Sequence, residues 1–279
     1  MPLRLLTALV LALLSLALQA QPRTSARPVL KVLIVGNSLM YANNGPALLR
    51  AIAASQPDSP RIETTSFLSP GASLAEHWRR GAVPRALGEH HWDAVIVQER
   101  GGLLACLADP ATRVGRECRD SERAHRQLLA LANARGIRVL LLGTWGPNAA
   151  WQSRLDAGLD ALRCSQGCER LYMGRWLRDF ARVSPTLQPF TEDAAMHPNL
   201  LGSLLISTRL YAALTGRALI DTPLALPQPL LQVTAQVDGT QPLETQKELQ
   251  GSDPPLKLAA SALAPLYRAV NLDWQDPSH

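Results

Sequence analysis

The sequence predicts an α/β fold in which a parallel sheet lies between two layers of helices. Three observations lead to this class. Short apolar segments of strand length alternate with segments of helical spacing from residue 30 to about residue 216. The apolar segments at 92–97 and 137–142 are almost continuously hydrophobic, as strands buried on both faces are. Each strand-like segment is followed by a helix-like one, and strands separated by helices form parallel sheets.

Five segments have the length and composition of strands. Residues 30–35, 92–97 and 137–142 are the mainly apolar runs. Residues 61–67 alternate between polar and apolar side chains and stop at a Ser-Pro-Gly turn at 69–71. Residues 171–176 are expected to form a fifth strand or an extended piece.

The spacing of apolar residues predicts helices at 46–54, 74–80, 121–134 and 149–162, and Gly136 ends the third of them. Residues 198–215 carry one more apolar stripe. Pro198 stands at the favoured first helical position and Gly216 at the stop. The last helix of the sheet domain is therefore expected to begin at Pro198.

The chain divides into four parts. We expect a signal peptide at 1–20, a polar linker at 21–29, the sheet domain at 30–220 and a C-terminal appendage at 221–279. In the appendage, three prolines between 223 and 229 and the segment 251–255 break regular structure, whereas 256–270 has helical spacing. The appendage is expected to pack on the sheet domain and to be partly irregular.

The N-terminus has the pattern of an export signal. Arg4 gives a positive start, residues 5–18 form an uncharged apolar run, and residues 19–22 offer a small-residue cleavage point. The alternative is an uncleaved membrane anchor, which the shortness of the run disfavours. We therefore expect a periplasmic or secreted protein with no stable membrane span after cleavage.

Cysteine spacing and charge limit the kinds of metal site and partner that are expected. The four cysteines suggest two local disulfides, Cys106 with Cys118 and Cys164 with Cys168, in an oxidising compartment. A metal site is disfavoured because no Cys-x-x-Cys pair and no histidine at ligand spacing is present. The net charge is +5, but basic residues are scattered among acidic ones and no basic run is interleaved with aromatics, so no nucleic-acid partner is expected. The sequence makes no prediction of oligomeric state.

Ser38 and His197 are the candidate nucleophile and base. Ser38 follows the first strand directly, at the carboxyl edge where ligands bind in such sheets. A serine hydroxyl needs a base to remove its proton, and the base needs an acceptor to orient it. Of six histidines, His197 is preferred because it stands at the mouth of the last helix, just after Glu192 and Asp193.

These residues resemble the blocks of the SGNH hydrolase superfamily. The Gly-Asn-Ser-Leu sequence at 36–39 is similar to its Gly-Asp-Ser-Leu block, with Asn in place of Asp. His197 with an upstream carboxylate resembles the last block, where one loop supplies acid and base. Residues 69–74 resemble the second block, whose glycine donates its main-chain N–H to the oxyanion. The resemblance covers roughly 30 to 216 and implies a flavodoxin-like three-layer α/β/α fold and a cofactor-independent serine hydrolase.

Two departures affect the roles that the resemblance implies. The superfamily places Asp three residues before His, where this chain has Ala194; Asp193, Glu192 or a main-chain carbonyl is left to orient His197. The third block normally ends its strand with Gly-x-Asn-Asp, and here the strand ends Val-Gln-Glu at 97–99. Gln98 is expected to supply the missing amide donor, so the oxyanion hole would comprise Ser38, Gly71 and Gln98.

The resulting prediction is an exported SGNH-type esterase of an atypical branch, with Ser38, His197 and Asp193 as the catalytic residues and no metal. Its expected substrate is a small-molecule, saccharide or lipid ester carrying an acyl or acetyl group; lipase and thioesterase are neighbouring activities. The alternative from another class is an exported binding module that keeps the fold but has lost turnover. The absent Gly-x-Asn-Asp and the displaced acid motivate that alternative.

Overall fold

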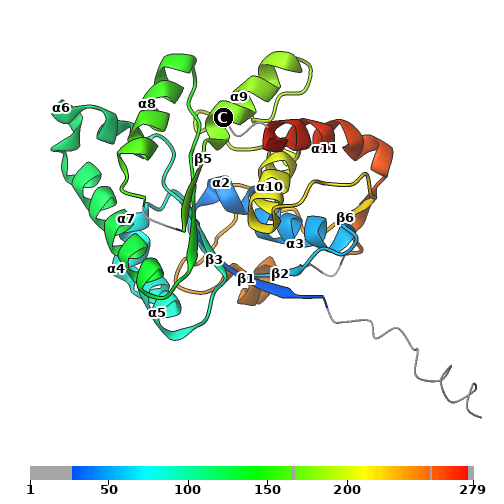
Figure 1. Cartoon of the computed structure of the whole chain (residues 1–279), viewed down its shortest axis with the longest axis horizontal. Helices are drawn as coiled ribbons and strands as arrows, with labels where there is room; N and C mark the ends of the chain where they lie inside the picture. The colour runs from blue at the N-terminus through cyan, green and yellow to red at the C-terminus, as the bar shows by residue number, and fades with distance from the viewer. Residues whose placement is uncertain (1–26, 165–166, 252, 276–279) are drawn as a thin grey trace, which may run out of the picture.

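The protein was analysed as a computed structural model, which describes residues 27–164, 167–251 and 253–275. Its centre is a five-stranded parallel sheet of order β2-β1-β3-β4-β5 (Figure 1). The strands are β1 (Val29–Gly36), β2 (Arg61–Leu68), β3 (Ala94–Gln98), β4 (Arg138–Leu142) and β5 (Cys168–Leu171). This arrangement confirms the predicted fold class. The predicted signal peptide and most of the linker lie outside the described residues.

Alternate side chains of each strand enter two separate hydrophobic clusters, which makes the fold three-layered. On β1, Val32 and Ile34 face one cluster, while Leu33 and Val35 face the other. The first cluster is covered by α3 (Gly45–Ser55), α9 (Met173–Val183), α10 (Leu200–Thr215) and α11 (Ala260–Gln275). The second is covered by α4 (Leu74–Arg80), α5 (Ala82–Glu89), α7 (Arg116–Ala134) and α8 (Ala149–Ala161). Both faces of the sheet are therefore closed to water, as a parallel sheet requires.

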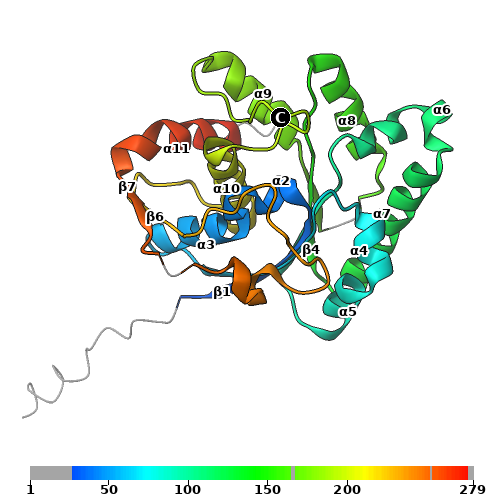
Figure 2. The same cartoon turned by 180° about the vertical axis from the view of Figure 1, so that it is seen from behind.

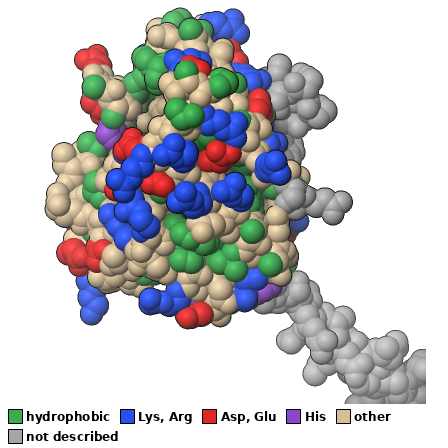
Figure 3. Space-filling model, turned by 90° about the vertical axis from the view of Figure 1, so that its left-hand side faces the viewer, with side chains coloured by type: hydrophobic (Ala, Val, Ile, Leu, Met, Phe, Trp, Pro, Cys, Tyr) green, Lys and Arg blue, Asp and Glu red, His purple; other side chains and the backbone are tan. Residues whose placement is uncertain are grey.

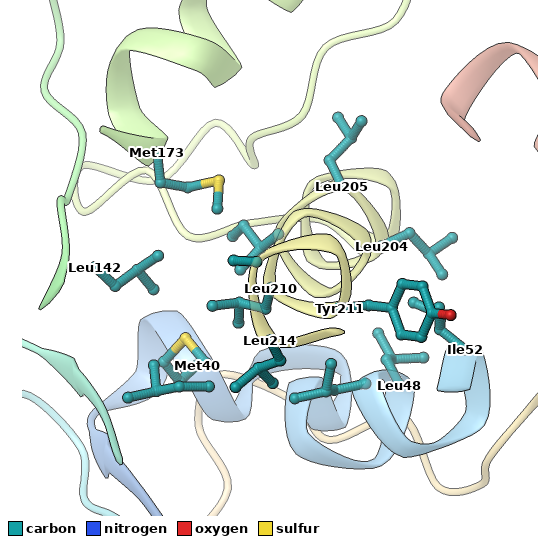
Figure 4. Packing of buried hydrophobic residues seen from close by; sticks show 14 of the residues in the cluster. Met40, Leu48, Ile52, Leu142, Met173, Leu204, Leu205, Leu210, Tyr211 and Leu214 are labelled. Atoms are coloured by element: carbon teal, nitrogen blue, oxygen red, sulfur yellow. The ribbon is translucent and has the colours of Figure 1, made fainter. Parts of the chain in front are cut away.

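The first cluster is centred on α10, which packs against α3. Figure 4 shows Leu210, Tyr211 and Leu214 of α10 close to Leu48 and Ile52 of α3. The shorter elements connect these layers at the carboxyl edge of the sheet: α2 (Ser38–Tyr41), α6 (Pro110–Arg113), and the 3₁₀ helices η1 (Ala42–Asn44) and η2 (Leu103–Ala108). Because α2 begins where β1 ends, Ser38 is held between a buried strand and a buried helical turn.

Several predicted elements differ from the structure. Residues 256–258, where helical spacing was expected, form β7 and the helix begins at Ala260, while α7 begins at Arg116, ahead of the predicted residue 121. The expected strand or extended piece at 171–176 is wrong: the edge strand ends at Leu171, and α9 follows. Met173, Leu177 and Phe180 recur at helical spacing and all enter the first cluster, so burial selects the helix there. Pro198 is not the first residue of α10, because Asn199 caps the helix by accepting from Gly202 N at 3.0 Å. His197 consequently lies in a loop that precedes α10.

The C-terminal part packs on the sheet domain as a continuation of its core. A small antiparallel pair, β6 (Leu224–Leu226) and β7 (Leu256–Leu258), has β6 beside α3. Two 3₁₀ helices, η3 (Leu243–Thr245) and η4 (Lys247–Leu249), follow β6 along the chain, and η3 lies beside β2. Side chains of β6, η3 and α11 belong to the first cluster. Figure 2 shows the segment before η3, in orange, running from beside α2 down toward β1. Within the part of the chain that the structure describes, no helix is long and apolar enough to cross a membrane.

Both disulfides suggested by the cysteine spacing are present: Cys106–Cys118 ties η2 to α7, and Cys164–Cys168 joins a residue after α8 to the first residue of β5. The face over α7 and α8 mixes arginines with acidic side chains (Figure 3). Arg123 lies 3.4 Å from Asp120 and Arg100 lies 2.9 Å from Glu117, all on the surface. Such exposed pairs contribute about 0–1 kcal/mol each, so they describe a solvated surface more than a source of stability.

Candidate active site

Ser38, His197 and Asp193 form one hydrogen-bonded chain. The Ser38 Oγ lies 2.9 Å from His197 Nε2, and His197 Nδ1 lies 2.9 Å from Asp193 Oδ2. A carboxylate only accepts, so the contact at Nδ1 requires the imidazole proton there and leaves Nε2 free to accept the Ser38 proton. Of the three orienting groups left open by the sequence, Asp193 is the one found at Nδ1. This geometry is that of an activated serine nucleophile.

The two ends of the loop that carries Asp193 and His197 are hydrogen-bonded to each other. This explains how Asp193 reaches His197 from four residues upstream. Phe190 and Pro198 pair as an isolated antiparallel bridge, and Thr191 N donates to His197 O at 2.8 Å. Between them Met196 adopts a φ of 51°, a left-handed conformation unusual for this residue type. That turn absorbs the additional residue, so the displaced spacing still brings carboxylate and ring together.

Hydrogen bonds keep Asp193 ionised. Burial raises its pKa, but donation from the Thr191 hydroxyl at 2.7 Å and from His197 outweighs burial and lowers the pKa to about 2. The His197 main-chain N–H adds a third donor at 3.2 Å. The carboxylate is therefore charged throughout the neutral and mildly acidic range and holds one tautomer of the ring.

Two residues that the sequence did not identify as functional support this arrangement. Trp145 is buried and donates from Nε1 to Met196 O at 2.7 Å. Asn43 donates from Nδ2 to Pro198 O at 3.0 Å, tying the nucleophile segment to the His197 loop. Its φ of 56° is a conformation that asparagine tolerates, and the Asn-Asn pair at 43–44 is the sequence signal that could have marked it.

The C-terminal segment also reaches the nucleophile. Tyr41, three residues after Ser38, is fully buried and donates its hydroxyl to Val233 O at 2.8 Å. Burial raises the pKa of Tyr41, and an interaction with the Ser38 hydroxyl partly offsets this. Asn43 N donates to Leu231 O at 2.8 Å. The predicted appendage thus forms part of the scaffold that fixes α2.

Two main-chain N–H groups are available for an oxyanion. Ser38 N and Gly71 N donate to no other group among the described residues. Gly71 has a φ of +61°, and its position is exposed and open, with no atom within 4 Å of where a Cβ would stand. Its left-handed backbone therefore favours glycine even though space does not demand it.

The structure does not place Gln98 as an oxyanion donor, which corrects the expectation from the sequence. The side chain is wholly buried; its Oε1 accepts from Asn37 N at 3.0 Å and its Nε2 donates to Glu99 O. Gly36 makes room for it, because a Cβ there would stand 2.6 Å from Gln98 Oε1. Both ends of the amide are thus used by main chain, and Gln98 holds the residue that precedes the nucleophile.

This position of Gln98 predicts a stability effect. Gln98→Ala should lower the free energy of unfolding by about 2 kcal/mol, because Asn37 N–H would be left buried without an acceptor. Urea denaturation measures the change. A variant of unchanged stability that loses only kcat would instead indicate that Gln98 is the donor which the sequence suggested.

A buried histidine, His77, supports the end of β1. His77 Nε2 donates to Gly36 O at 2.7 Å, and the ring is almost completely buried. Burial lowers the pKa of His77 below its ordinary value of 6.5; Arg80 adds to this effect, while the Gly36 hydrogen bond, Glu99 and Glu76 oppose it. His77 is therefore neutral in the folded protein at neutral pH.

His77 should make folding sensitive to acid. As the pH is lowered below about 6.5, the unfolded chain binds a proton at this residue before the folded protein does. The free energy of unfolding therefore decreases as the pH decreases, until the folded pKa is passed. His77→Gln keeps a donor toward Gly36 O and cannot titrate, so its unfolding free energy should fall less steeply in this window. His91→Gln, at a side chain 82% exposed, is the matched control. Equal slopes in wild type and His77→Gln would contradict the assignment.

Within the described residues, no group of three or more His, Cys, Asp or Glu side chains is placed to hold a metal ion. The structure brings a serine hydroxyl, an imidazole and a carboxylate into one hydrogen-bonded chain. Acyl transfer through a serine uses groups of these kinds.

No protein-family model and no curated protein matches the chain. Among solved structures, it is similar to LAE5, an alpha/beta hydrolase enzyme from the metagenome of Lake Arreo, Spain, with 20% identity, a TM-score of 0.48, and coverage of 68% of this chain and 96% of that one. It is also similar to Axe2, an acetylxylan esterase from Geobacillus stearothermophilus, at 12% identity and a TM-score of 0.47, covering 70% and 97%. The psychrotrophic esterase EstA from Pseudoalteromonas sp. matches at 16% identity and a TM-score of 0.45, covering 65% and 94%. These likenesses are too distant to indicate a substrate.

Proposed function

We propose that this protein is an exported, SGNH-type serine esterase that cleaves acyl or acetyl esters of a saccharide or lipid. The observation that carries the proposal is the unbroken chain from Ser38 Oγ through His197 to Asp193, with 2.9 Å at each contact. Export to the periplasm or outside the cell is supported by the apolar run at 5–18 and by the two disulfides.

In the proposed mechanism, His197 Nε2 takes the Ser38 proton while Ser38 Oγ attacks the ester carbonyl carbon. The resulting oxyanion accepts from the main-chain N–H groups of Ser38 and Gly71. Collapse of this intermediate breaks the bond to the alcohol oxygen, which takes the proton from His197, and leaves Ser38 acylated. His197 then removes a proton from water, which attacks the acyl carbon. The second intermediate collapses: its bond to Ser38 Oγ breaks, Ser38 Oγ takes the proton from His197, and the acid is released. Asp193 stabilises the imidazolium formed in each half.

A panel of p-nitrophenyl esters tests this function. Acetate, butyrate and octanoate esters distinguish a small acyl site from a long one, and Ser38→Ala reports the background. We expect the wild type to hydrolyse at least one ester with saturation kinetics that Ser38→Ala lacks. A folded wild type that is no faster than Ser38→Ala on the whole panel would favour the inactive binding module instead.

A further inference from the structure

Asn37 joins the nucleophile to the loop that carries Gly71. Its side-chain Oδ1 accepts from Leu39 N at 3.1 Å, which caps α2. Its Nδ2 donates to Ala72 O at 3.0 Å, across 35 residues of sequence. The side chain is 2% exposed, so both contacts are shielded from water. One amide therefore fixes the start of α2 and the residue that follows Gly71.

The loop from 69 to 74 is held on both sides of Gly71. Before it, Ser69 N donates to Gly36 O at 3.3 Å. After it, Ala72 O accepts from Asn37, and Leu74 N donates to the buried Glu99 carboxylate at 3.0 Å. Gly71 itself faces open space where a Cβ would stand, with no atom beyond its chain neighbours within 4 Å of that point. The direction of its N–H is consequently set by these neighbours.

We propose that Asn37 is a positioning residue of the oxyanion hole: its side-chain donor to Ala72 O sets the Gly71 N–H relative to Ser38. This proposal rests on the proposed function. The proposal is suggested by the placement of Gln98. Because the Gln98 amide bonds to main-chain groups, only the main-chain N–H groups of Ser38 and Gly71 are left to stabilise the oxyanion. With so few donors, the distance between them matters more, because an oxyanion hole acts through donors fixed before the reaction.

The proposal also explains the amide at this position. Asp and Asn cap a helix about equally well, so capping alone does not require Asn37. A carboxylate, however, has no donor for Ala72 O and would oppose that carbonyl with a second acceptor. The bond to Ala72 O is the contact that distinguishes the two residue types in this structure.

Asn37→Ser is the test, because serine keeps the capping acceptor but is too short to reach Ala72 O. Loss of a whole oxyanion donor costs about 10²- to 10³-fold in kcat, so a displaced donor should cost about 10- to 100-fold with little change in KM. The affinity for an alkyl boronic acid, which forms an anionic tetrahedral adduct on the serine, should fall by a similar factor. Asn148→Ser, at the exposed cap of α8, is the matched control and should leave both quantities unchanged.

The outcomes separate the inference from the function on which it rests. An active wild type with Asn37→Ser at wild-type kcat and boronate affinity overturns the positioning role alone. A wild type that neither hydrolyses esters nor binds the boronic acid overturns the proposed function and this inference together. Should Asn37→Ser fold poorly, Asn37→Asp keeps size and cap, and full kcat in that variant would equally contradict the role of the Ala72 bond.

Discussion

Ser38→Ala should lower ester hydrolysis by about 10⁵- to 10⁶-fold, because removal of the nucleophile disables the whole catalytic unit. The Ser38 hydroxyl contacts His197 Nε2 and interacts with Tyr41, and loss of this one polar group should change the unfolding free energy by about 1 kcal/mol. Steady-state hydrolysis and urea denaturation of the same preparation measure the two effects.

Ser153→Ala is the matched control for Ser38→Ala, since it removes a hydroxyl from the exposed side of α8. It should retain full activity and stability. If Ser38→Ala hydrolyses esters at the rate of this control, the hydrolysis does not pass through Ser38 and the mechanism fails.

His197→Ala should lose nearly as much activity as Ser38→Ala, and the double variant should lose no more than either one, because members of one catalytic unit are not additive. Asp193→Asn should cost less, about 10³- to 10⁴-fold, since an amide at Nδ1 favours the wrong tautomer while leaving serine and base in place. Measuring kcat/KM for the three single variants and the double variant tests this ordering.

Glu192→Gln provides the control for the acid, because Glu192 was an open candidate for orienting His197 and lies exposed in the same loop. It should be close to wild type. Full activity in Asp193→Asn would show that the His197 ring is oriented by another group. Any loss of activity between pH 7 and pH 5 should not come from protonation of Asp193, because its pKa of about 2 keeps the carboxylate ionised in this range.

The parts of the fold that depend on local pattern could be predicted from the sequence. The boundaries of β1, β2 and α4 lie within a residue of the predicted segments. Burial shows in the order of neighbouring side chains, as an apolar run in β1, as alternation in β2 and as helical spacing in α4. The segment 171–176 was harder. Its apolar residues suit a strand or a helix, and only their burial against α10 and α11 selects α9.

In the site too, features set by local sequence could be predicted, whereas those set by tertiary contacts could not. Ser38 and His197 could be selected as candidates because the end of a strand and the start of a late helix can be recognised in the sequence. The role of Gln98 could not, because the direction of its amide depends on Gly36 leaving room and on Asn37 N across the sheet. The contacts of Trp145 and Asn43 with the His197 loop likewise join residues far apart in sequence.

The position of Asp193 bears on the alternative of an inactive binding module. Two departures motivated that alternative, the displaced acid and the missing asparagine donor. The first has a structural explanation, because Met196 turns the loop and returns the carboxylate to His197 Nδ1. The second remains, and the donors at Ser38 and Gly71 must suffice if the protein is an esterase.

Labelling with a fluorophosphonate, followed by mass mapping of the peptides, tests most directly whether Ser38 is an activated nucleophile. The reagent phosphonylates a serine whose proton is removed by a neighbouring base. The account predicts one modified residue, Ser38, in the folded wild type, with labelling strongly slowed in His197→Ala and absent from Ser38→Ala. No labelling of folded wild type, or labelling at a different serine, would contradict it.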